Sequence, residues 1–154
     1  MSQTNLITLP GNNLRAALKY LRLGWYPIPI CWPVTGEDGE AMCGCGRGHT
    51  GKDVGKAPLL GKDYQALRPT EADVTAWWTR WPEANIAVLI EPSGLIVVDP
   101  DSSEAIAEAQ ALGLPPTATV KSGKGEHHYY TRPPGVPASR KTRGGTSKAL
   151  DVLG

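Results

Sequence analysis

The sequence predicts an α+β fold, in which helices pack on a mainly antiparallel sheet. Helix-like and strand-like segments follow one another along the 154 residues in the order helix, strand, helix, hairpin, helix, hairpin. Each hairpin candidate joins two strand-like runs through a short turn rich in glycine, serine or proline. Because a chain of this length can bury one core, we expect a single domain over residues 1–154.

The first helix is expected to begin after Asn12 or Asn13, either of which can cap it, and to end at Gly24. The apolar face of this helix consists of Leu14, Ala17, Leu18 and Leu21. The segment GWYPIPIC, residues 24–31, follows. Since its two prolines carry no N–H, it is expected to be an edge strand or an extended segment.

The second helix is expected to begin after Thr70, whose side chain can cap it together with Asp73, and to stop at Pro82. Its apolar positions follow the i, i+3, i+4, i+7 pattern at Val74, Trp77, Trp78 and Trp81. We expect these tryptophans to pack in the core, with base stacking as the less favoured alternative.

A third helix is expected from Ser103 to Leu112, with Ile106 and Ala109 facing inward, and Gly113 ends it. The strands around this helix are expected to pair as two hairpins, through the turns EPSG and SGKGE. The four strands lie at residues 85–90, 95–98, 117–121 and 127–131.

The formal net charge is only +1, but the two signs are segregated along the chain. Every charge from Glu83 to Glu108 is negative, and nearly every charge from Lys121 to Lys148 is positive. An acidic centre beside a basic flank suits a metal site that faces a polyanionic partner. The alternative is that the basic stretch, rich in glycine and proline, is a solvated loop.

No apolar run approaches the roughly 20 residues that span a bilayer. The N-terminus lacks the basic and apolar regions of a secretory signal. We therefore expect a cytoplasmic protein with no membrane partner. In a reducing compartment, its three cysteines favour metal binding or free thiols over disulfides.

Two aspartates, Asp99 and Asp101, directly follow the apolar run 95–98. Alternate strand residues face the same way, so both carboxylates are expected on one side, about 6.5 Å apart along the chain. At about 5 Å the two charges repel by roughly 3 kcal/mol, and a Mg²⁺ or Mn²⁺ ion would turn this repulsion into attraction. The alternative is a surface turn or a helix cap, in which Asp101 and Glu104 flank the first turn of the next helix.

Residues 31–56 are a Gly-rich, polar excursion that we expect to be an insertion ordered by a metal ion. Cys31, Cys43, Cys45 and His49 make a Cys₃His set that can close a tetrahedron around Zn²⁺. Because all four positions would be filled, the role would be structural. The alternative is free thiols with a surface histidine. Cys31 is the weakest candidate, because its segment can also be a buried strand.

The turn SGKG, Ser122 to Gly125, joins the last two strands and exposes backbone N–H groups beside a lysine, which suits polyphosphate. It is not a P-loop, because no GK[ST] precedes a helix. The adjacent residues His127 and His128 face opposite sides of a strand, so only one of them can face a site. A structural role is the alternative for either histidine.

Together these motifs resemble the N-terminal domain of bifunctional DNA primase/polymerases (prim-pol), in the archaeo-eukaryotic primase superfamily. Such domains occur in plasmid, phage and prophage replication proteins. The resemblance covers most of the chain. In sequence order it includes GWYPIPI, the Cys/His loop leading into GKAP, the tryptophan helix, NIAV, VVDPD, SGKGEHHYY and the aspartate of LDVLG.

The resemblance implies a primase-polymerase-like fold, with a mixed or antiparallel sheet, an RNA-recognition-type core, flanking helices and the zinc-knuckle-like loop. It implies that Asp99, Asp101 and Asp151 bind catalytic Mg²⁺ or Mn²⁺. The register SGKGExH selects His128 over His127 as the residue that contacts the incoming triphosphate. Further nucleotide contacts are expected from Ser122, Gly123, Lys124 and Gly125.

The implied activity is primer synthesis or extension on a DNA template from NTPs or dNTPs, by a two-metal mechanism. A helicase domain or a replicative helicase is an expected partner. The basic residues expected to bind the template or the triphosphate are Arg132, Arg140, Lys141 and Arg143.

Two residues depart from the family pattern. Pro100 stands between the aspartates, where a β-branched residue is commoner, and Glu126 replaces a glycine beside the phosphate site. The sequence stops three residues after Asp151, so we expect a C-terminally truncated domain. These features motivate an alternative, a catalytically inactive primase-like module that binds DNA or the replisome. A metal-dependent nuclease or phosphoesterase with the same Asp/His set is a further alternative.

Overall fold

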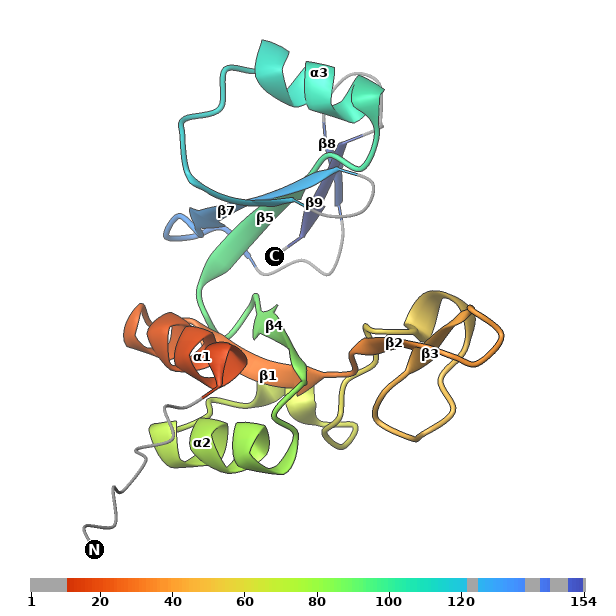
Figure 1. Cartoon of the computed structure of the whole chain (residues 1–154). Coiled ribbons are helices and arrows are strands. Elements are labelled where there is room, and N and C mark those ends of the chain that lie inside the picture. The colour runs from red at the N-terminus through yellow and green to blue at the C-terminus, as the bar shows by residue number, and fades with distance from the viewer. Residues whose placement is uncertain (1–10, 122–124, 138–141, 145–149, 154) are drawn as a thin grey trace, which may run out of the picture. The chain divides into compact units, whose positions relative to one another are not determined.

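The computed structural model describes residues 11–121, 125–137, 142–144 and 150–153 (Figure 1). Across these ranges the chain forms three α-helices and antiparallel strands, which confirms the predicted α+β class. It divides into two compact units, residues 1–89 and residues 90–154. Whether the two units fold as one cooperative domain stays a prediction. No helix in the described ranges is long and apolar enough to cross a membrane.

The first unit contains a two-stranded antiparallel sheet of β1 (Tyr26–Ile30) and β4 (Asn85–Leu89). Helices α1 (Asn12–Arg22) and α2 (Glu71–Arg80) pack against each other and against β1. The same unit holds a small hairpin of β2 (Pro33–Thr35) and β3 (Ala41–Cys43), and the short 3₁₀ helices η1 (Gly51–Asp53) and η2 (Tyr64–Ala66).

The hairpin expected between residues 85–90 and 95–98 is wrong, because β4 pairs with β1 instead. The prolines of β1 permit this pairing. Cys31 N donates to Ala57 O at 2.8 Å, and Pro29 O accepts from Leu59 N at 3.1 Å, so the proline edge of β1 faces residues 57–59. The missing N–H groups therefore lie away from β4, on the edge of β1 that makes only a few bonds to residues 57–59.

Helix α1 has the predicted apolar face, but the expected asparagine cap is wrong. Gly11 is the N-cap, without a side-chain hydrogen bond. Asn13 instead uses its side-chain amide to donate to Ala84 O at 3.0 Å. Trp78 Nε1 of α2 donates to the same carbonyl at 3.0 Å. One backbone acceptor just before β4 therefore binds both helices, and the buried Trp78 lies in the core as predicted.

The predicted cap of α2 is confirmed as a full capping box. Thr70 N donates to Asp73 Oδ2 at 2.8 Å, and Asp73 N donates to Thr70 Oγ1 at 3.3 Å. The hydrogen bonds from the Thr70 backbone, and then from its hydroxyl, hold the pKa of Asp73 below its usual value. Accepting these bonds favours the ionised carboxylate at the positive end of the helix.

The second unit is built on an antiparallel sheet with the strand order β6-β7-β5-β9-β8 among the described residues. The RNA-recognition-type core stays a prediction. Strands β6 and β7 form the predicted hairpin around the SGKGE turn. The strands span β5 (Leu95–Asp99), β6 (Ala118–Lys121), β7 (Glu126–Thr131), β8 (Thr142–Gly144) and β9 (Leu150–Leu153).

Helix α3 (Ser103–Ala111) covers one face of this sheet (Figure 1). Ala105 and Ala109 are buried against Val98 of β5, and Tyr130 of β7 packs beside them. Small residues on the inner face of α3 let the helix approach the strands closely. This packing leaves the alternate residues of β5 and β7, which face the other way, free of α3.

Candidate functional site

Polar residues from four neighbouring strands form a row across the sheet of the second unit. In β5 and β7, His127 Nε2 lies 3.3 Å from Asp99 Oδ1, and the two side chains are 35% and 22% exposed. The register places Asp151 of β9 directly opposite Asp99, and Arg143 of β8 directly opposite Asp151. The sheet thus brings two of the three predicted acidic residues to neighbouring positions, although fifty-two residues of sequence separate them.

A second cluster lies in the first unit. The sulfur atoms of Cys31, Cys43 and Cys45 and a ring nitrogen of His49 all lie within 4.8 Å of one another, so these four residues could hold a metal ion. His49 Nδ1 is 3.3 Å from Cys43 Sγ and 3.4 Å from Cys45 Sγ. Zinc bonds of 2.0–2.3 Å in a tetrahedron would put such atoms about 3.6 Å apart, which is close to the two distances from His49.

Cys31 and Cys43 are also bonded to each other as a disulfide. The expectation that the cysteines form no disulfide is therefore wrong for this pair. The reason is the packing, because the end of β1 and the end of β3 meet in the buried core of the first unit beside Trp78. A metal ion would need both sulfurs reduced, since thiolates are the ligands.

The chain around this cluster is tightly packed. Gly44 N donates to Trp32 O at 2.8 Å, and a Cβ added at Gly44 would overlap the Trp32 ring. Gly55 N donates to Cys43 Sγ at 3.4 Å, which is the kind of hydrogen bond that stabilises a thiolate ligand. Glycine at position 44 is therefore required by the close approach of the Trp32 ring.

A comparison with family models finds a match that runs through both units. The model of bifunctional DNA primase/polymerase, N-terminal (Prim-Pol), matches residues 17–154. The chain belongs to the Prim-Pol family. No curated protein matches the chain. Family membership is what the sequence motifs predicted, and it makes a primase/polymerase activity, with DNA and nucleotides as substrates, the expectation to test against the site.

In the Prim-Pol fold of this chain, Asp101 is not the cap of α3. Ser102 is the N-cap, and its hydroxyl accepts from Ala105 N at 3.1 Å. Asp101 is exposed just beyond the end of β5, whereas Pro100 is buried. The capping alternative for Asp101 is therefore wrong, and its carboxylate is available to solvent or to a ligand.

The start of β7 is attached to the aspartate segment. Glu126 N donates to Pro100 O at 3.1 Å. A Cβ added at Gly125 would overlap the same carbonyl oxygen and would lie 2.9 Å from the Asp101 Cα. Of the predicted nucleotide-binding turn, Gly125 thus lies against the D-x-D backbone. Ser122, Gly123 and Lys124 are outside the described residues.

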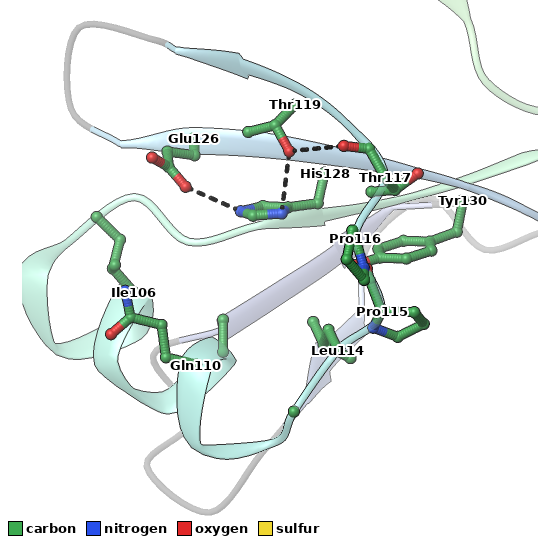
Figure 2. A pocket seen from close by; sticks show the side chains of 12 residues that line it. Ile106, Gln110, Leu114, Pro115, Pro116, Thr117, Thr119, Glu126, His128 and Tyr130 are labelled. Carbon is green, nitrogen blue, oxygen red and sulfur yellow. Dashed lines mark hydrogen bonds and ion pairs between the residues drawn. The ribbon is translucent and has the colours of Figure 1, made fainter.

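The histidine beside Asp99 is His127, whereas the sequence register had selected His128. His128 faces the α3 side of the sheet, where its Nε2 lies 3.1 Å from Glu126 Oε2 and its Nδ1 lies 3.4 Å from Thr119 Oγ1 (Figure 2). Glu126 is held by this contact on the side of the sheet away from Asp99. Glu126, which departs from the family pattern, therefore does not bring its carboxylate toward the polar row.

His128 lines a cavity of about 470 Å³ beneath α3 (Figure 2). The apolar wall of this cavity comes from the helix, from the loop that follows it and from β7, and includes Ile106, Leu114, Pro115, Pro116 and Tyr130. Strand alternation predicted that only one histidine could face the acidic residues. Which one does so depends on how β7 aligns with β5, which short-range sequence patterns do not specify.

The predicted basic residues are only partly described. Arg132 N donates to Gly94 O at 2.7 Å, and its guanidinium nitrogen Nη1 is buried without a hydrogen-bond partner among the described residues. Arg143 lies at the end of the polar row in β8. Arg140 and Lys141 lie outside the described residues.

Proposed function

We propose that this Prim-Pol domain is a metal-dependent nucleotidyltransferase that makes or extends primers on a DNA template from NTPs or dNTPs. The observation that carries the proposal is the polar row, in which Asp99 lies opposite Asp151 and 3.3 Å from His127. Carboxylates with one adjacent imidazole suit the binding of a triphosphate through divalent ions. A plasmid or phage replication context, with a helicase in the same or another chain, is part of the proposal.

The residues of the row fit Mg²⁺ or Mn²⁺ chemically. Carboxylate oxygens are the ligands these ions prefer, and both Asp99 and Asp101 are accessible at the end of β5. With Asp151, they would hold the catalytic ions. When bound, such ions supply activation of the primer 3′-hydroxyl and neutralisation of the pyrophosphate charge.

The chain's own contribution is positioning and charge. We infer that His127, in place of His128, contacts the phosphates, because its ring is partly exposed beside Asp99. Gly125, which follows the predicted phosphate-binding segment 122–124 in the sequence, is packed against Pro100, so β7 begins next to the aspartate segment. Backbone N–H groups and a lysine in segment 122–124 would bind the phosphates of the same nucleotide.

The basic residues that follow β7 would bind the template strand or the triphosphate. Arg143 is the best-placed member of this set, because its position in β8 adjoins that of Asp151. Arg132, Arg140 and Lys141 complete the proposed set. Contacts of this kind release counterions, so template binding is expected to weaken steeply with salt.

The Cys/His cluster is proposed to bind a structural Zn²⁺ in the reduced protein. The distances from His49 Nδ1 to the Cys43 and Cys45 sulfurs suit tetrahedral coordination, and four protein ligands would leave no open position for a substrate. Because Cys31 and Cys43 are part of the buried core of the first unit, the ion would stabilise that core as well as the loop.

Primer extension by paired variants tests the proposed function. The double variant D99N/D101N, assayed on a labelled primer–template with Mn²⁺ or Mg²⁺, is expected to lose extension. His127→Ala is expected to lose about 10²–10³-fold in rate, as for the removal of one group that stabilises transition-state charge. His128→Ala, on the same strand but the other face, is the matched control and should retain most activity.

Full extension by D99N/D101N would contradict the proposal. A wild-type chain that binds the template but never extends a primer would support the inactive binding module instead. Shortened primers would favour a nuclease.

A further inference from the structure

Helix α1 presents a face of three cations to solvent. Arg15, Lys19 and Arg22 are spaced four and three residues apart, so they share one side of the helix. All three are exposed, and α1 contains no acidic residue. Within the part of the chain that the structure describes, no ion pair with a carboxylate is found for any of them.

Helix stability does not account for this face. Lys19 and Arg22 lie in the last turn, where positive charge interacts favourably with the helix dipole. Arg15 lies near the first turn, where positive charge is unfavourable, and no acidic residue in that turn offsets it. The spacing therefore places the three cations on one side of α1 for a reason other than helix stability, which points to a partner outside the helix.

The surface along these cations is hollowed and polar. A shallow depression of about 600 Å³ lies on this face, lined by Asn12, Arg15, Ala16, Leu18, Lys19 and Arg22. Ala16 leaves room between the longer basic side chains. From Arg15 to Arg22 the helix rises about 10 Å, enough for two to three phosphates of one nucleic-acid strand.

We propose that this α1 face, in the first unit, binds the phosphodiester backbone of single-stranded DNA. A lipid surface is less suitable, because a membrane-bound helix inserts its apolar face. In α1 that face is already occupied, since Ala17 is fully buried and Leu14 and Leu21 pack against the core of the first unit. The inference rests on the DNA substrate in the proposed function, but it does not rest on catalysis.

Fluorescence anisotropy with labelled single-stranded (dT)₂₀ tests the site, using the full chain with no nucleotide or added magnesium. In R15Q/K19Q/R22Q, the slope of log K against log salt concentration should become shallower by about 2, since each phosphate contact on a single strand contributes about 0.7. Affinity at 50 mM salt should fall about tenfold or more. The charge-preserving R15K/R22K should keep the wild-type slope.

The control variant K52Q/K62Q/R68Q removes the same charge from exposed positions elsewhere in the first unit. It should keep a slope within about 0.7 of the wild type. Equal losses in both triple variants, or an unchanged slope in R15Q/K19Q/R22Q, would overturn the inference. The inference would also be overturned if R15Q/K19Q/R22Q kept the wild-type salt slope for DNA but lost binding to vesicles of anionic phospholipid.

The two proposals fail separately. D99N/D101N should keep the wild-type salt slope for (dT)₂₀ while losing primer extension. If D99N/D101N extends primers normally, the proposed catalytic site is wrong, and the α1 result stands. If R15Q/K19Q/R22Q binds (dT)₂₀ like the wild type and D99N/D101N is inactive, the α1 inference is wrong and the catalytic site stands.

Discussion

Gly125→Ala is expected to damage the candidate site without changing a proposed metal ligand. The new Cβ would overlap the Pro100 carbonyl oxygen and approach the Asp101 Cα to 2.9 Å. Both neighbours are backbone, so neither can rotate away, and the start of β7 must separate from the aspartate segment. The hydrogen bond from Glu126 N to Pro100 O, now 3.1 Å, would lengthen or break.

The size of the effect follows from this geometry. Overpacking of this kind costs about 1–3 kcal/mol of stability. A displacement on the order of 1 Å between the start of β7 and the aspartates would lower the extension rate about 10²-fold. Thermal unfolding measures the first effect, and primer extension, with KM for nucleotide and kcat determined separately, measures the second.

Gly61→Ala is the matched control, because nothing lies within 4 Å of a Cβ added there. It should leave stability and activity close to those of the wild type. If Gly125→Ala behaved like Gly61→Ala in both assays, the close packing of β7 on the aspartate segment would not exist in solution. The proposed link between the turn and the acidic residues would then be refuted.

Two further predictions concern the first unit. Thr70→Ala should destabilise it by about 1 kcal/mol, while Thr75→Ala on the exposed side of α2 should be nearly neutral, as measured by denaturant unfolding. Because the pKa of Asp73 is lowered in the folded state, the capping stability is present above its ordinary pKa of 3.8 and is lost as the pH falls through the folded value. The Thr70→Ala deficit should therefore shrink below pH 3.8, and a deficit independent of acid would contradict the capping role. Cys45→Ser should remove one bound Zn²⁺ per reduced chain by elemental analysis and lower the unfolding temperature; unchanged metal content would refute the cluster as a zinc site.

Elements defined by short-range patterns could be predicted from the sequence. The buried stripe of α2 and its capping box follow from spacings within twelve residues, between Thr70 and Trp81. The hairpin of β6 and β7 follows from two strands around one turn. In each case the stabilising partners are neighbours in the chain, so a local pattern is enough.

Pairings between distant segments were not predictable in the same way. The EPSG turn favoured a hairpin, but β4 pairs with β1, which lies more than fifty residues earlier. The prolines of β1 suggested an edge strand but did not indicate which edge is used. The cap of α1 failed for a similar reason, because Asn13 bonds to the distant Ala84 rather than to its own helix.

The candidate site shows the same division. Asp99 and Asp101 were identifiable because a carboxylate pair directly follows an apolar strand, and Asp151 because it resembles a family motif. The choice between His127 and His128 depends on the alignment of β7 with β5, in which Val98 lies opposite His128. That alignment turns His127 toward Asp99. The four members of the Cys/His cluster were predicted together, but the bond between Cys31 and Cys43 was not.

The most direct test of the central claim is a crystal structure of the domain soaked with Mn²⁺ and a dNTP. Anomalous density for Mn²⁺ is predicted at Asp99, Asp101 and Asp151, with a triphosphate oxygen within hydrogen-bond distance of His127. Carboxylates without Mn²⁺, or a triphosphate bound in the cavity beside His128, would contradict the account.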